Sequence, residues 1–189
     1  MKKYILASGS PRRKDLLRAM GIEFEVILPS DETEILHKSF NYELVEKVAQ
    51  EKGESVLKKA PENSIIISAD TVVVCDNIIL GKPRSFDDAF HILKLLNNNT
   101  HKVVTAVCVI NSDSGKKLVR SETSNVTFDN ISDEELKDYI YKFKPYDKAG
   151  SYGIQELKSS FIKNIEGEYE NIVGLPIKLL KSMLNEIMQ

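Results

Sequence analysis

A run of β-branched and apolar residues, SIIISADTVVVC at positions 64–75, constrains the fold of this chain more than any other segment. Ile and Val at this density predict a strand, and the length of the run predicts that it is buried. Asp70 stands in its middle, although a buried carboxylate must be paired, hydrated or bound to a metal. The alternative is an edge strand with Asp70 facing solvent. We therefore treat Asp70 as a candidate site residue.

The two-residue period of a strand places the neighbours of Asp70 on two faces. Ser68, Asp70 and Val72 share one face, where the small serine leaves room for a ligand beside the carboxylate. Thr71 lies on the other face, and its role is ambiguous because threonine is common in strands.

Strands and helices alternate along the chain, with hairpins inserted at residues 76–77 and 112–115. The expected strands are 3–7, 24–28, 64–75, 78–80, 103–110, 117–128 and 160–166. The expected helices are 11–20, 42–59, 87–96, 133–143 and 176–188. This order predicts an α/β fold with a mixed, twisted sheet and flanking helices. Without an internal repeat or a linker, we expect a single domain over residues 1–189.

The charges nearly cancel, with 26 Lys and Arg against 28 Asp and Glu and a formal net charge of −2. This balance argues against general binding to nucleic acid and confines any basic site to a local pocket. No run approaches 18 apolar residues, so we expect no membrane span, and the apolar start is too short for a signal peptide. Cys75 and Cys108 lie in apolar runs as small hydrophobic residues. A reducing cytoplasm fits these features.

Two arginines stand in the first turn of the helix that begins at Pro11, with Ser10 as the expected N-cap. Cations at this end oppose the helix dipole and lie beside unpaired backbone N–H groups, which is unfavourable unless an anion binds. Ser8, Ser10, Arg12 and Arg13 together predict a phosphate cradle. A capped helix with solvated arginines is the alternative.

Two lysines elsewhere in the chain are further candidates for contact with an anion. Lys52 continues the apolar stripe of the second helix, so its ammonium must find an anion or extend past the stripe to solvent. Lys82 stands in the turn Gly81-Lys82-Pro83, where most lysines are simply solvated.

The segment 147–155, DKAGSYGIQ, combines two glycines with polar groups, including Gln155, and could approach a ligand closely. It matches neither a Walker A loop nor a dinucleotide fingerprint, and a plain glycine-rich turn is the alternative. His37, His91 and His101 lack the spacing of a zinc site. Cations for phosphate and carboxylates for a hard metal suit metal-assisted phosphoanhydride hydrolysis.

These motifs resemble the Maf proteins, a family of nucleotide pyrophosphatases, over essentially the whole chain. The matching segments are LASGSPRR at 6–13, ADTVV at 69–73, GKP at 81–83, TAV at 105–107, DKAGSYGIQ at 147–155 and VGLP at 173–176. The resemblance implies a Maf/Ham1-like fold with two lobes around a central cleft. It also implies cleavage of a nucleoside triphosphate to the monophosphate and pyrophosphate with Mg²⁺ or Mn²⁺.

The resemblance also implies roles for individual residues. Asp70 matches the catalytic base and a metal ligand, and Lys52 and Lys82 match catalytic polar positions. Ser8 and Arg13 match phosphate contacts. The dTTP/UTP branch of the family is distinguished by substrate-binding positions that match Arg12, Thr71 and Gln155.

The second metal ligand of the family is a glutamate after the second strand. Counting from Pro29 and Ser30 favours Glu34, whereas a shift of the register would favour Glu32. The resemblance further implies a homodimer and a link to septum formation. A nucleotide-binding regulator of cell division that does not hydrolyse its ligand is the alternative function.

Overall fold

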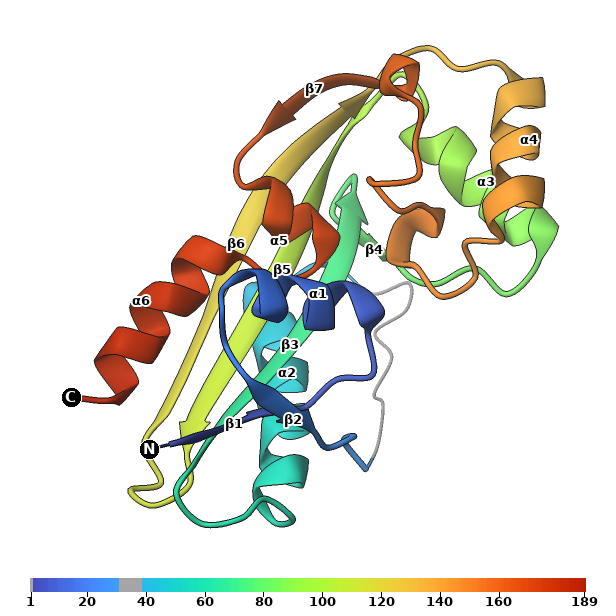
Figure 1. The fold of residues 1–189 in the computed structure, drawn as a ribbon. Helices are drawn as coiled ribbons and strands as arrows, with labels where there is room; N and C mark the ends of the chain where they lie inside the picture. Colours follow the sequence, from blue (N-terminus) through green and yellow to red (C-terminus); the bar gives the residue numbers. More distant parts are fainter. Residues whose placement is uncertain (1, 31–38) are drawn as a thin grey trace.

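The computed structural model describes residues 2–30 and 39–189, and within them the strands form one seven-stranded mixed sheet (Figure 1). The strands are β1 (Lys3–Leu6), β2 (Phe24–Val26), β3 (Ser64–Cys75), β4 (Ile78–Leu80), β5 (Thr100–Asn111), β6 (Lys117–Phe128) and β7 (Ile162–Glu166). Their order is β2-β1-β3-β5-β6-β7, with β4 paired to β3. β1 runs parallel to β2 and β3, while the other pairs are antiparallel. The predicted mixed sheet is confirmed.

Helices cover both faces of this sheet (Figure 1). They are α1 (Pro11–Ala19), α2 (Tyr42–Leu57), α3 (Phe86–Leu96), α4 (Asp133–Phe143), α5 (Tyr169–Val173) and α6 (Ile177–Ile187). α2 packs on one face through Val48 and Val56, and α1 and α6 pack on the other through Leu17 and Met183. α3 and α4 enclose a further core around Phe128. Within the described ranges, no helix is long and apolar enough to cross a bilayer.

Several boundaries differ from those expected. β5 starts at Thr100 and not at 103, because Thr100 already pairs with Thr127 of β6. β2 stops at Val26, two residues before the predicted end. A short 3-10 helix, η2 (Ser159–Phe161), replaces the start of the strand expected at 160 and buries Phe161. The sequence also gave no sign of α5, which is too short to show a helical period.

Cys75 and Cys108 are both free and buried, as expected. Burial raises the pKa of the Cys108 thiol to about 12, so this side chain is packed as a neutral hydrophobe.

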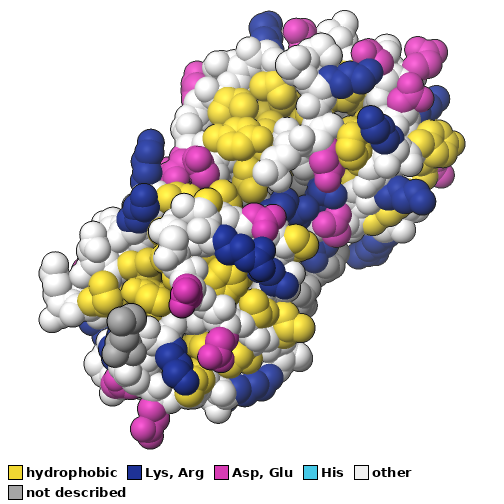
Figure 2. Space-filling model, in the orientation of Figure 1, with side chains coloured by type: hydrophobic (Ala, Val, Ile, Leu, Met, Phe, Trp, Pro, Cys, Tyr) yellow, Lys and Arg dark blue, Asp and Glu magenta, His cyan; other side chains and the backbone are white. Residues whose placement is uncertain are grey.

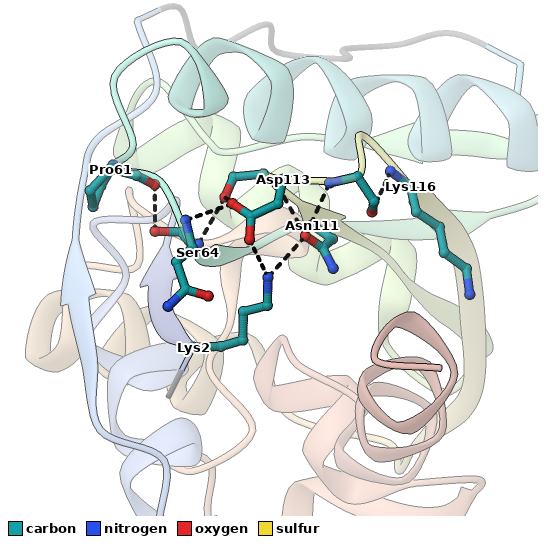
Figure 3. A network of polar contacts seen from close by, with 9 residues as sticks. Lys2, Pro61, Ser64, Asn111, Asp113 and Lys116 are labelled. Carbon is teal, nitrogen blue, oxygen red and sulfur yellow. Dashed lines mark hydrogen bonds and ion pairs between the residues drawn. The ribbon is translucent and has the colours of Figure 1, made fainter.

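A network of polar contacts between Lys2, Asn63 and Asp113, here called the polar clasp, lies at the end of the sheet where β3 begins and β5 ends (Figure 3). Lys2 Nζ lies 2.6 Å from Asp113 Oδ2, and Asn63 N–H donates to Asp113 Oδ1 at 2.7 Å. The hydrogen bond from Lys2 holds the pKa of Asp113 below its usual range. The clasp ties the β5–β6 turn to the segments before β1 and β3. It supports the register that places Asp70 opposite Ala106.

Candidate active site

A pocket of about 340 Å³ opens at an unpaired stretch of β3. β1 pairs with β3 as far as Ile67, and β4 pairs with it from Val73 onward, so residues 68–72 have no partner strand on that side among those described. The pocket is lined by Ser8, Arg12, Arg13, Lys52, Asp70, Thr71, Lys82 and Gln155, among others. Figure 2 shows basic and acidic side chains close together at the waist of the molecule. The structure therefore gathers every predicted site residue that it describes.

Asp70 and Lys52 form an ion pair at the edge of this pocket. Lys52 Nζ lies 2.6 Å from Asp70 Oδ1, and their side chains are 13% and 15% exposed. α2 aims Lys52 at the strand because Lys52 continues the helix face that packs on the sheet through Val48 and Val56. Of the two alternatives for Lys52, contact with an anion is the one found, and the solvent-facing alternative for Asp70 is wrong. Each charge compensates the other in a largely desolvated position.

Arg13 is held by groups from three segments of the chain. Its Nε donates to Gly174 O at 2.9 Å, Nη1 to Ser8 Oγ at 3.2 Å and Nη2 to Thr71 Oγ1 at 3.1 Å. The guanidinium plane is fixed by these bonds before a ligand arrives, as preorganised anion binding requires. The alternative of a solvated arginine does not hold for Arg13.

Ser10 occupies the N-cap position of α1 and Pro11 its first turn, as predicted, but the Ser10 side chain makes no capping bond. Its backbone N–H donates instead to Ser8 Oγ at 3.2 Å. The first turn of α1 contains no acidic residue. The positive end of the helix thus adds to Arg12 and Arg13 on one side of the pocket.

Arg12 contacts the opposite wall of the pocket through Asp147, with Nη1 3.3 Å from Oδ2. Asp147 Oδ1 also pairs with Lys148 Nζ at 2.8 Å. Burial raises the pKa of Asp147, but the hydrogen bond and charge of Lys148 and the charge of Arg12 outweigh this and lower it. The sequence indicates that the segment 147–155 could approach a ligand, but it indicates no individual role for Asp147 or Lys148.

The glycine-rich segment packs against the sheet. Gly150 has φ +69°, and a Cβ there would lie 2.7 Å from Val73 Cγ2. Its N–H donates to Gly81 O at 3.1 Å, which ties the segment to the turn that carries Lys82. Close approach at Gly150 is therefore to β3, while Gly153 lines the pocket with Gln155.

The two described histidines differ in their surroundings. His91 is exposed, whereas His101 is buried with Nε2 2.7 Å from the Tyr152 hydroxyl. Burial lowers the pKa of His101 to about 4, so its ring is neutral near pH 7. Tyr152 in turn lines the pocket. His37 lies outside the described residues.

The carboxylates of the pocket bear on metal binding. Glu32 and Glu34 lie outside the described residues. Among the residues that are described, no group of three or more His, Cys, Asp and Glu side chains is placed to hold a metal. The described pocket lining contains Asp70 and Asp147. Mg²⁺ is commonly held by one or two carboxylates together with substrate phosphates. Asp70, in a pocket also lined by Arg13 and Lys82, fits such a donor set.

The fold and the pocket define a mixed α/β protein with a pocket lined by four cations, Arg12, Arg13, Lys52 and Lys82. Residues 3–187 match the family described as Maf-like protein, and the chain belongs to this family. A dTTP/UTP pyrophosphatase of Clostridium beijerinckii is 45% identical over 186 residues, covering 98% of this chain and 99% of that relative. A dTTP/UTP pyrophosphatase of Alkaliphilus oremlandii is 45% identical over 177 residues, covering 94% and 92%.

The fold also resembles that of the Ham1 protein of Staphylococcus aureus, with a TM-score of 0.54 at 14% identity. The match covers 98% of this chain and 99% of that structure. The Ham1-like fold expected from the resemblance is thus confirmed.

Proposed function

We propose that this protein is a nucleoside triphosphate pyrophosphatase that hydrolyses dTTP and UTP to the nucleoside monophosphate and pyrophosphate. The observation that carries the proposal is the Asp70–Lys52 pair in a pocket also lined by Arg13. A carboxylate able to accept a proton from water lies there beside cations able to hold a triphosphate. The relatives from Clostridium beijerinckii and Alkaliphilus oremlandii, both named dTTP/UTP pyrophosphatases, support the same activity.

In the proposed mechanism, the cations bind and orient the triphosphate. Arg13, fixed by Ser8, Thr71 and Gly174, binds phosphate oxygens together with the N–H groups at the start of α1. Lys82 contacts the triphosphate from the opposite turn. This arrangement aligns the α-phosphorus with Asp70 and stabilises the charge that develops on the leaving group.

Asp70 then removes a proton from a water molecule as the water oxygen attacks the α-phosphorus. The bond from this phosphorus to the bridging oxygen breaks, and pyrophosphate leaves with the bonding electrons. Lys52, 2.6 Å from Asp70, keeps the carboxylate oriented and places a positive charge beside the reacting phosphate.

A directed chain of hydroxyl groups supports recognition of the base at Thr71. Thr105 Oγ1 donates to Asn171 O at 3.0 Å, so it must accept the hydrogen of Thr71, whose Oγ1 lies 2.9 Å away. Thr71 therefore has no hydrogen left for a ligand, and because Arg13 Nη2 donates to its Oγ1 at 3.1 Å, one lone pair remains for the pocket. We assign it as the acceptor for the ring N–H of uracil or thymine, which cytosine lacks. Arg12 and Gln155 contact the remaining polar groups along the edge of the same base.

A divalent cation, Mg²⁺ or Mn²⁺, completes the proposed site, with Asp70 and Glu34 as its protein ligands. When bound, the ion neutralises phosphate charge and polarises the phosphoryl oxygens. Glu34 lies outside the described residues, so its part rests on the family resemblance. A small-molecule substrate in the cytoplasm and a homodimeric assembly belong to the same proposal.

A panel of nucleoside triphosphates with Mg²⁺ or Mn²⁺ tests this function, with pyrophosphate and orthophosphate assayed separately. We expect pyrophosphate from dTTP and UTP, and much less from CTP, ATP and GTP. Orthophosphate as the first product would contradict cleavage between the α and β phosphates. Binding without any product would favour a nucleotide-binding regulator, and preferential purine turnover would overturn the dTTP/UTP assignment alone.

A further inference from the structure

Gln155 reaches the pocket on a tight turn. Glu156 N–H donates to Gly153 O at 2.9 Å, which closes the turn. Gly153, Ile154 and Gln155 line the pocket, whereas Glu156 lines a separate cavity on the other side of the turn, together with Tyr139 of α4. The turn therefore separates the pocket from these two side chains.

The Tyr139 hydroxyl holds both ends of this turn. It accepts a hydrogen bond from Gly153 N–H at 3.0 Å and donates one to Glu156 Oε2 at 3.0 Å. A hydroxyl can do both at once because it has one hydrogen and two lone pairs. Burial raises the pKa of Tyr139, so the hydroxyl keeps its hydrogen at neutral pH. Tyr139 is 5% exposed and lies on the buried face of α4.

The second carboxylate oxygen of Glu156 anchors the turn to the pocket wall. Glu156 Oε1 lies 3.2 Å from Lys148 Nζ, and the Lys148 side chain is 8% exposed. Lys148 also forms an ion pair with Asp147, and Asp147 forms one with Arg12, so ion pairs connect the turn to Arg12. Packing is also tight, because a Cβ on Gly153 would lie 3.0 Å from both Glu156 Oε2 and Lys148 Cε. These contacts leave the turn little room to shift.

We propose that Tyr139 and Glu156 are positioning residues that fix the Gln155 amide against the base of a bound nucleotide, although neither lines the pocket. The proposal rests on the proposed function, in which Gln155 contacts the base. A hydrogen bond weakens steeply when its geometry is distorted, so a shift of the turn weakens base binding. The phosphate contacts through Arg13 and the Asp70–Lys52 pair are made by other segments and stay unchanged.

The test is a double-mutant cycle measured with UTP. Tyr139→Phe removes the hydroxyl, and we expect KM to rise about tenfold with kcat within about twofold, as expected when uniform binding is lost. Gln155→Ala should raise KM at least as much. Adding Tyr139→Phe to Gln155→Ala should then raise KM no further, because the amide that Tyr139 positions is gone. Tyr141→Phe, on the same helix at a residue that is 68% exposed, is the matched control and should leave both constants unchanged.

Multiplicative effects of the two substitutions would overturn the proposal, because Tyr139 would then act independently of Gln155. Should Tyr139→Phe fail to fold by circular dichroism, Glu156→Gln is the second variant, and an unchanged KM in it would overturn the proposal. Wild-type turnover is measured first. Failure of the wild type to release pyrophosphate from UTP would overturn both this proposal and the proposed function, whereas an active wild type with multiplicative effects would overturn the positioning role alone.

Discussion

Lys52 Nζ and Asp70 Oδ1 lie 2.6 Å apart, which joins α2 to the middle of β3 in the lining of the pocket. Asp70→Asn keeps the shape of the side chain and removes the proposed base. We expect the variant to fold and to lose turnover of UTP by about 10²- to 10⁴-fold. Pyrophosphate release measures the loss. Asp15→Asn, at an exposed carboxylate of α1 outside the pocket, is the control and should retain activity. Wild-type turnover by Asp70→Asn would rule out Asp70 as the base.

Lys52→Met removes the partner of Asp70 while keeping an unbranched side chain that is one atom shorter. We expect the free energy of unfolding to fall by about 1–3 kcal/mol, because a largely buried carboxylate loses its counter-charge. Turnover should fall by about 100-fold or more as transition-state stabilisation is lost. Urea denaturation and a pyrophosphate assay measure the two effects.

Lys117→Met is the matched control for this substitution. Lys117 of β6 pairs with Glu54, which lies on α2 as Lys52 does. This pair is more exposed, and an ion pair at such a position contributes at most about 1 kcal/mol. Activity should survive in this variant. Equal losses of activity in both variants would show that the loss reflects general damage and not the contact with Asp70.

Gly150 and Gly115 offer a comparison of backbone strain with crowding. Both have φ +69°, but a Cβ on Gly115 meets nothing within 4 Å, whereas one on Gly150 would lie 2.7 Å from Val73 Cγ2. Gly115→Ala should therefore cost about 1–2 kcal/mol of the free energy of unfolding, from the left-handed backbone alone. Gly150→Ala should cost about 1–3 kcal/mol more because Val73 must move. Urea denaturation of both variants tests the order, and equal losses would argue against the packing described for Gly150.

His101 makes stability depend on pH in a defined window. Its pKa is about 4 in the folded protein, against about 6.5 in an unfolded chain. As the pH falls from 6.5 to 4, the unfolded chain gains a proton that the folded protein does not take up. Stability is therefore full above pH 6.5 and falls by about 3 kcal/mol on reaching pH 4.

The variant His101→Gln isolates this contribution. We expect the stability difference between wild type and variant, measured by urea denaturation, to shrink by about 3 kcal/mol from pH 7.5 to pH 4. The difference for His91→Gln, at an exposed histidine, should change far less. Parallel pH curves for wild type and His101→Gln would contradict the buried, neutral state of His101.

Much of the site could be predicted because its residues break local patterns. Asp70 interrupts an apolar strand, Lys52 continues an apolar helix face, and two arginines oppose the dipole of α1. Each conflict is visible within a few residues, and each is resolved in the structure by a partner or by the pocket. The hairpins and the mixed sheet followed from strand periods and turn residues in the same way.

The Tyr139 network could not be found from the sequence. Tyr139 fits the buried face of an amphipathic helix, and only the packing of α4 against the turn at 153–156 brings its hydroxyl to Gly153. In the sequence, Lys148 and Glu156 likewise resemble ordinary surface charges. Only the fold shows that Lys148 is buried with its Nζ beside Glu156 Oε1. The start of β5 was missed because polar residues such as Lys102 pair there at an exposed end of the sheet.

Hydrolysis of UTP in ¹⁸O-labelled water tests the central claim most directly, with the position of the label read by mass spectrometry. Attack of water on the α-phosphorus predicts one ¹⁸O atom in UMP and none in pyrophosphate, with both products suppressed in Asp70→Asn. Label in pyrophosphate, or release of UDP and orthophosphate, would contradict the account.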